Sequence, residues 1–125
     1  MIEPLKSSTL LMKIAKEFKF DSAHFLKDYH GKCENLHGHT YRMQVMIEGE
    51  IQPNGLIMDF AELKRIVNKN VVDIWDHANI NDTLEHASAE NMCIWAWGKL
   101  KEELPGLVEI RIWETPTSFA VYDGS

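Results

Sequence analysis

The chain has 125 residues, the size of one compact domain. Lys and Arg total 13 and Asp and Glu total 19, so the formal net charge is −6, which argues against a general nucleic-acid-binding protein. No apolar run is long enough to cross a membrane, and the start lacks the basic region and apolar stretch of a signal peptide. We therefore expect one domain over residues 11–125 after an extension over residues 1–10, with no nucleic-acid or membrane partner.

The two cysteines, Cys33 and Cys93, are too few for a disulfide framework. Cys93 lies among Met92, Ile94 and Trp95, and we expect it to be a buried small hydrophobic residue. This use of cysteine predicts a reducing compartment, so the expected location is the cytoplasm.

The first part of the chain is typical of two β-strands that form a hairpin. Residues 11–25 have a mixed strand-like pattern, whereas residues 40–51 alternate more cleanly. One face of the second strand carries Tyr41, Met43, Val45 and Ile47. The polar segment over residues 25–36 is long for a hairpin loop, and loops of this length are usually functional or mobile.

The rest of the chain predicts two helices followed by two short strands. Asp59 begins the first helix as its N-cap, and Ser88 begins the second. The apolar stripe of the first helix consists of Phe60, Leu63, Ile66, Val67, Val71 and Ile74. The core face of the second helix consists of Met92, Trp95, Ala96 and Leu100. Pro105 and Gly106 end this helix, and strands follow over residues 108–112 and 118–122.

The resulting order, β-β-α-α-β-β, predicts an α+β fold. We expect an antiparallel four-stranded sheet with the two helices on one face. A sheet of this kind has two open edges, which proteins usually cover or pair. The pattern therefore gives a mild indication that the protein forms oligomers through its sheet.

Three histidines are expected to converge where the first two strands meet. His37 and His39 flank Gly38, and side chains two residues apart lie on the same face of an extended strand. His24 ends the first strand where these two begin the second, so an antiparallel hairpin brings all three together. Three neutral imidazoles suit zinc, nickel, copper or iron. We predict Zn²⁺ because of its availability and its tetrahedral preference.

Two alternatives to a catalytic metal site stay open on this pattern alone. Three protein ligands leave the fourth coordination position open, whereas Cys33 as a fourth ligand would make the site structural. The histidines can also simply lie near a turn. Close to a dication the pKa of the Cys33 thiol should fall, and its thiolate can then act as a ligand, a nucleophile or a base.

Further candidate groups follow the first helix and the third strand. Asp76 and His77 form a neighbouring carboxylate and imidazole that can transfer protons, although such a pair often only caps a helix end. Glu114 ends an apolar strand; if it is buried, a ligand with two adjacent N–H groups would satisfy both of its oxygens. We expect His30 and His86 to be surface residues.

Several segments in this order resemble the 6-pyruvoyltetrahydropterin synthase / 6-carboxytetrahydropterin synthase family. The matching segments are FDSAH (20–24), CENLHGHTY (33–41), GLIMDFAELK (55–64), DHANIND (76–82), SAEN (88–91) and ET (114–115). The resemblance extends from Phe18 to Tyr122. It implies the tunnelling fold, whose element order agrees with the predicted one. It also implies a homohexamer of two stacked trimers, with active sites between subunits.

The resemblance further implies a role for each candidate residue. It assigns zinc binding to His24, His37 and His39. It assigns proton transfer to Cys33, Asp76 and His77, and it assigns the anchoring of a pterin ring to Glu114.

Three residues separate Cys33 from His37, and this spacing resembles that of the queuosine-pathway branch of the family. The biopterin-making branch typically has a longer gap. The queuosine-pathway branch consists of carbon–carbon lyases. They convert 7,8-dihydroneopterin triphosphate to 6-carboxy-5,6,7,8-tetrahydropterin and release acetaldehyde and triphosphate. Lys27, Lys32 and Arg42 are local candidates for binding the triphosphate. The alternatives are formation of 6-pyruvoyltetrahydropterin on the same scaffold, and a non-catalytic zinc- or pterin-binding oligomer.

Overall fold

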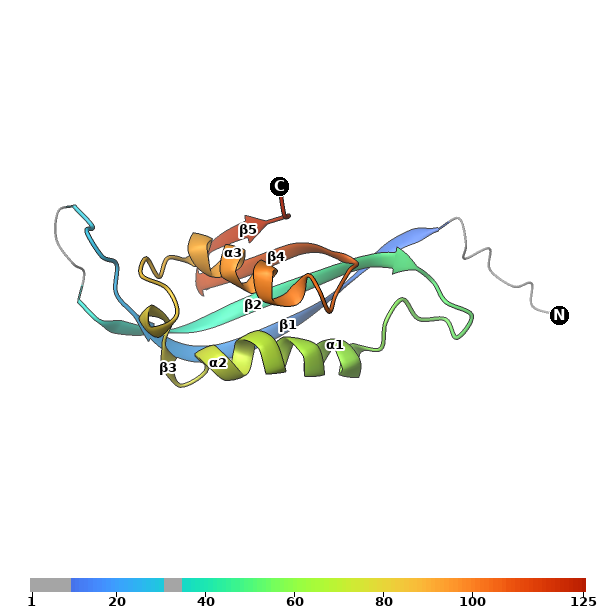
Figure 1. Ribbon diagram of the computed structural model, residues 1–125, viewed down its shortest axis with the longest axis horizontal. Helices are drawn as coiled ribbons and strands as arrows, with labels where there is room; N and C mark the ends of the chain where they lie inside the picture. The colour runs from blue at the N-terminus through green and yellow to red at the C-terminus, as the bar shows by residue number, and fades with distance from the viewer. Residues whose placement is uncertain (1–9, 31–34) are drawn as a thin grey trace.

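The computed structural model describes residues 10–30 and 35–125. The extension predicted over residues 1–10 therefore lies almost entirely outside the described residues, as do the candidate site residues Lys32 and Cys33. Two long strands, β1 (Leu11–His24) and β2 (His37–Glu50), pair antiparallel along their whole length. β4 (Leu107–Thr115) and β5 (Ser118–Tyr122) extend the sheet beside β2 (Figure 1).

The described residues form a five-stranded sheet rather than the predicted four-stranded one, with the order β3-β1-β2-β4-β5. The additional strand, β3 (Ala78–Asn79), pairs parallel with β1 at Ser22 and Ala23. The Ser22 hydroxyl also donates to the Ala78 carbonyl at 2.7 Å. A strand of two residues is too short to show alternation, so the sequence pattern does not predict it.

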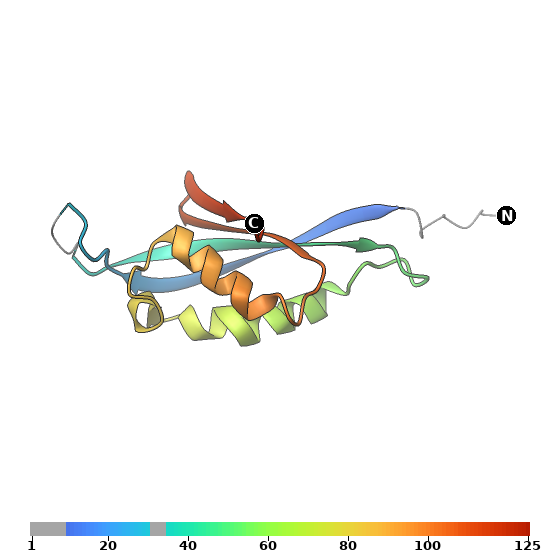
Figure 2. The same cartoon turned by 45° about the horizontal axis from the view of Figure 1, so that its top comes forward.

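Both predicted helices are present and lie on one face of the sheet (Figures 1 and 2). The first begins as α1 (Phe60–Val67), passes through a π-helical turn (Asn68–Val72) and ends as α2 (Asp73–Trp75). The second is α3 (Ala89–Leu100). No helix among the described residues is long and apolar enough to cross a membrane.

The predicted N-caps of both helices are confirmed. The Asp59 carboxylate accepts a hydrogen bond from the Ala61 N–H at 2.8 Å. The Ser88 hydroxyl accepts one from the Asn91 N–H at 3.2 Å. Each cap satisfies a backbone donor that has no partner inside its helix, and this explains why the helices begin at these residues.

The π-helical turn changes which face of the first helix is buried. Before the turn, Leu63, Ile66 and Val67 are buried as predicted, although Phe60 is exposed. Within the turn Val71 and Val72 are buried, and after it Trp75 is buried, whereas the predicted Ile74 is 41% exposed. The turn contains a hydrogen bond from the Asp73 N–H to the Asn68 carbonyl, which spans one residue more than an α-helical bond. Each later side chain is therefore displaced by one position from the α-helical pattern.

The core lies between the sheet and the helices and contains the predicted face of β2. Tyr41, Met43, Val45 and Ile47 are all buried. On α3, Met92, Ala96 and Leu100 are buried, and Trp95 packs partly buried against them. Cys93 is also buried as predicted, and burial raises the pKa of its thiol to about 12. The centre of the Trp75 ring lies 4.6 Å from the centre of the Trp95 ring and 5.8 Å from that of the Phe20 ring, so Trp75 links the helices to β1.

The displaced helical face can be tested with two neighbouring substitutions. We expect Trp75→Ala to lower the free energy of unfolding by about 3–5 kcal/mol, because it leaves a cavity in the core. Ile74→Ala should change this free energy by less than about 0.5 kcal/mol, because the side chain is exposed. Urea unfolding followed by circular dichroism measures both values. A larger loss for Ile74→Ala than for Trp75→Ala would contradict the π-helical turn.

Candidate metal centre and active site

Three histidine side chains converge at one end of the β1–β2 ribbon. His24 ends β1, and His37 and His39 begin β2. The register places His24 opposite His37 and Ser22 opposite His39. One ring nitrogen of each histidine lies within 4.8 Å of the other two, and the Nε2 atoms of His24 and His37 are 3.1 Å apart. Histidine nitrogens this close together can hold a metal ion between them.

Backbone carbonyls fix the orientation of two of these rings. His24 Nδ1 lies 2.7 Å from the Ala87 carbonyl, and His37 Nδ1 lies 2.8 Å from the Asn35 carbonyl. A carbonyl can only accept a hydrogen bond, so each Nδ1 carries the proton and each Nε2 presents a lone pair. Metal-binding histidines are usually oriented in this way. The chemistry of the donor set therefore fits a cation such as Zn²⁺.

A buried tyrosine packs against two of these histidines. The Tyr41 ring contacts His24 and His39 with ring centres 5.9 Å and 5.6 Å apart. Burial, and to a smaller extent the charge of Glu114, raise the pKa of the Tyr41 phenol. The phenol is therefore neutral at physiological pH, and His24 itself is only 1% exposed. The histidines thus sit at the boundary between the apolar core and the solvent.

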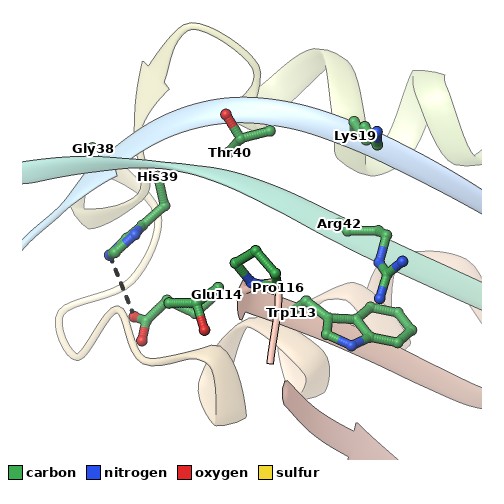
Figure 3. Close-up of a pocket in the computed structure, with 9 residues that line it drawn as sticks. Lys19, Gly38, His39, Thr40, Arg42, Trp113, Glu114 and Pro116 are labelled. Carbon is green, nitrogen blue, oxygen red and sulfur yellow. Dashed lines mark ion pairs between the residues drawn. The ribbon is translucent and has the colours of Figure 1, made fainter. Parts of the chain in front are cut away.

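The Glu114 carboxylate lies beside the histidines. Its Oε1 atom is 3.3 Å from His24 Nε2 and 3.8 Å from His39 Nε2. Figure 3 shows the side chain reaching from β4 toward His39. Glu114 also borders a hollow of about 320 Å³ together with Glu90, which lies in the first turn of α3. A ligand next to the metal centre would therefore meet Glu114 first and Glu90 beyond it.

Asp76 and His77 lie at the edge of β1, directly after α2. The Asp76 Oδ1 atom accepts a hydrogen bond from the Asp21 N–H at 3.0 Å, and the His77 N–H donates to the Asp21 carbonyl at 2.7 Å. These bonds hold His77 in a left-handed conformation with φ of 54°. The Asp76 Oδ2 atom is 3.7 Å from His77 Nε2, and the His77 side chain is 80% exposed. The pair is thus oriented by β1 but does not belong to the three converging histidines.

The cations predicted to bind triphosphate do not gather in one place. Lys27 pairs with Glu85 at 2.7 Å and borders a separate hollow. Arg42 borders a cavity of about 510 Å³ that also contains His39 and Glu114. Lys32 lies outside the described residues.

Two residues of this region were not singled out from the sequence. Lys19 borders the same cavity as Arg42 and lies directly opposite it in the strand register. The sequence did contain this signal, because pairing His24 with His37 and counting back five residues on β1 and forward five on β2 pairs Lys19 with Arg42. Glu90 offered no such signal, since an acidic residue in the first turn of a helix is common.

The metal centre predicts a specific loss of zinc binding. We expect His24→Ala to weaken zinc affinity by more than about 100-fold, because even the loss of an outer partner of a metal ligand costs 10- to 100-fold. His86→Ala is the control, because the His86 side chain is exposed and does not belong to the group of three histidines. Zinc titration against a chelating indicator measures both affinities. Unchanged affinity in His24→Ala would contradict this metal centre.

Comparisons with known proteins agree with the fold. The family model described as 6-pyruvoyl tetrahydropterin synthase matches residues 13–125. The chain is 40% identical to a Haemophilus influenzae protein named 6-carboxy-5,6,7,8-tetrahydropterin synthase, over 90% of this chain and 99% of that protein. It is 37% identical to a Pyrococcus furiosus protein named dihydroneopterin monophosphate aldolase, over 82% of this chain and 89% of that protein.

Solved structures show the same architecture. The structure of Caenorhabditis elegans 6-pyruvoyl tetrahydropterin synthase is similar with a TM-score of 0.82 and 31% sequence identity, covering 93% of this chain and 97% of that one. The predicted tunnelling fold is thereby confirmed. Since the family match spans nearly all of the chain, this protein belongs to the 6-pyruvoyl tetrahydropterin synthase family.

Proposed function

We propose that the protein is a zinc-dependent carbon–carbon lyase of queuosine and 7-deazapurine biosynthesis. Its reaction would convert 7,8-dihydroneopterin triphosphate and water to 6-carboxy-5,6,7,8-tetrahydropterin, with release of acetaldehyde and triphosphate. The observation that carries this proposal is the group of three oriented histidines beside the Glu114 carboxylate. The name of the Haemophilus influenzae relative supports the choice of product.

The Nε2 atoms of His24 and His37, with a ring nitrogen of His39, would hold the metal ion. When bound, Zn²⁺ would acidify the hydroxyls of the substrate side chain and stabilise negative charge that develops on them. The Ala87 and Asn35 carbonyls keep two of the rings in the required tautomer before any substrate binds. Because three protein ligands would leave the fourth coordination position open to a substrate oxygen, we assign the metal to catalysis rather than to folding.

Carboxylates next to the metal centre would hold the pterin ring. The amino-pyrimidinone edge of a pterin offers adjacent N–H groups, and a carboxylate can accept two of them at once. We propose Glu114 for this role because it lies next to the histidines and is two-thirds buried. Glu90 borders the same hollow and is the rival for the same contact.

Proton transfer would use Cys33, Asp76 and His77. The Cys33 thiolate would remove a proton from the substrate side chain and become a thiol, and the exposed His77 imidazole, oriented by Asp76, would deliver its own proton to the product or relay one. Because His77 lies at the edge of β1 and not among the metal-binding histidines, we propose that it serves the site of a neighbouring subunit. This arrangement requires a homo-oligomer, for which we propose a hexamer of two trimers.

The free edge of the sheet supports such an assembly. β5 lies at one end of the strand order, so one side of it is unpaired within the described chain. Its Phe119 and Val121 side chains are 49% and 44% exposed. Pairing of β5 with a strand of another subunit would satisfy its backbone groups and cover both side chains.

A second candidate reaction is cleavage of the corresponding monophosphate. The Pyrococcus furiosus relative is named dihydroneopterin monophosphate aldolase and is nearly as similar to this chain. The same metal centre suits this reaction, because an aldol-type cleavage also requires a stabilised oxyanion. Formation of 6-pyruvoyltetrahydropterin is a further outcome on the same scaffold. Product identity separates all three reactions.

Product analysis tests the proposed function directly. We expect the zinc-loaded protein to convert 7,8-dihydroneopterin triphosphate to 6-carboxy-5,6,7,8-tetrahydropterin and acetaldehyde, both identified by mass spectrometry. Cys33→Ala should lower turnover by about 10²- to 10⁴-fold, the usual contribution of a general base, and should keep its zinc. Absence of both products would refute the assignment. Loss of zinc in Cys33→Ala would instead identify a structural site with a sulfur ligand.

The two carboxylates can be distinguished by matched substitutions. Glu114→Gln should raise KM for the pterin substrate by about 10- to 100-fold, because an amide cannot accept two N–H groups with both of its termini. Glu90→Gln, which makes the same change in the same hollow, should have a smaller effect. Steady-state kinetics measure both values. A larger rise in KM for Glu90→Gln would move the pterin contact from Glu114 to Glu90.

A further inference from the structure

The sheet splits beyond the last pair of the β2–β4 ladder. These strands pair from Ile47 opposite Leu107 to Arg42 opposite Trp113. Past this point β2 continues against β1, and β4 turns into β5. The cavity of about 510 Å³ opens here, and Figure 3 shows the side chains around it. A ligand in this split can therefore touch residues of both strands.

The two ends of this cavity carry opposite charge. Glu114 and His39 lie together at the end next to the three histidines, and Lys19 and Arg42 border the cavity on the side away from them (Figure 3). The carboxylate end suits hydrogen-bond donors, and the basic end suits an anion. The cavity thus fits an elongated ligand with an N–H-rich head and an anionic tail.

The two cations face each other without a strong counter-charge. Lys19 and Arg42 are directly opposite in the β1–β2 register, a placement that destabilises a sheet when both residues carry the same charge. Arg42 Nη1 lies 3.9 Å from Glu17 Oε1, a long and half-exposed contact that contributes little. Within residues 10–30 and 35–125 no ion pair involves Lys19. An anion between the two side chains would relieve their repulsion.

Trp113 holds the Arg42 guanidinium in place. The central carbon of the guanidinium lies 3.9 Å from the centre of the Trp113 ring, and Trp113 is 9% exposed. This stacking uses the face of the guanidinium and leaves its N–H groups available in the plane. A planar fork of this kind binds phosphate oxygens in pairs. Trp113 is therefore a positioning residue for Arg42.

We propose that Lys19 and Arg42 form a subsite for a phosphate chain, with Arg42 oriented by Trp113. The identity of the natural ligand rests on the proposed function, in which the triphosphate tail of the substrate would occupy this subsite. The Glu114 end of the cavity would then receive the head of the same molecule. Glu114 lines the cavity and Glu17 lies 3.9 Å from Arg42 Nη1, and the charge of these two carboxylates favours an anion held between the two cations rather than beyond them.

Binding of inorganic tripolyphosphate tests the subsite without any turnover. Titration calorimetry on the zinc-loaded protein should give a Kd that rises about tenfold in Lys19→Gln and in Arg42→Gln, the effect of losing one charged hydrogen-bond donor. Arg65→Gln is the control, because it removes the same charge from the exposed surface of α1, where Arg65 pairs with Glu62. It should change the Kd by less than about twofold. Equal weakening in all three variants, or none in Lys19→Gln and Arg42→Gln, would overturn the subsite.

A second variant tests the part played by stacking. Arg42→Lys keeps the charge but loses the planar fork, so its Kd should lie between those of the original protein and Arg42→Gln. Thermal unfolding of each variant shows whether it is folded. In the enzyme assay, Lys19→Gln should raise KM for the triphosphate substrate more than it lowers kcat. If tripolyphosphate binds as expected but no pterin product forms, the subsite stands and the proposed function fails.

Discussion

The single register of the β1–β2 ribbon is the constraint on which the site depends. Pairing of His24 with His37 brings the three histidine side chains together and, five pairs further along, places Lys19 opposite Arg42. A slip of one residue would turn every β2 side chain to the other face, so it would expose the core residues and separate the histidines. Burial of the face that contains Tyr41 therefore fixes the strand register, and with it the geometry of the site as well as the stability of the fold.

The segments that flank the helices also position residues of the site. The carbonyl that orients His24 belongs to Ala87, immediately before α3, and the segment that carries Asp76 and His77 returns to β1 after α2. Packing of the helices on the sheet thus sets the tautomer of His24 and the position of Asp76 and His77. The geometry of the site depends on tertiary packing between distant segments, although His37 and His39 are only two positions apart in the sequence.

Much of this arrangement follows from patterns that the sequence carries locally. Alternation identified β2 and its buried face, caps identified both helix starts, and the positions of His24, His37 and His39 predicted that the three side chains converge. The position of Trp75 could not be predicted in this way, because a π-helical turn is a deviation from the period on which the prediction relies. The approach of Glu114 to the histidines depends on how β4 diverges from β2, which no local pattern encodes.

The central claim is that the three histidines form an open catalytic site and not a closed structural one. Zinc K-edge X-ray absorption on the resting protein tests it most directly. We expect His24, His37 and His39 as nitrogen ligands at about 2.0–2.1 Å, completed by an oxygen ligand. A sulfur ligand at about 2.3 Å would show that Cys33 closes the coordination shell, and it would contradict the account.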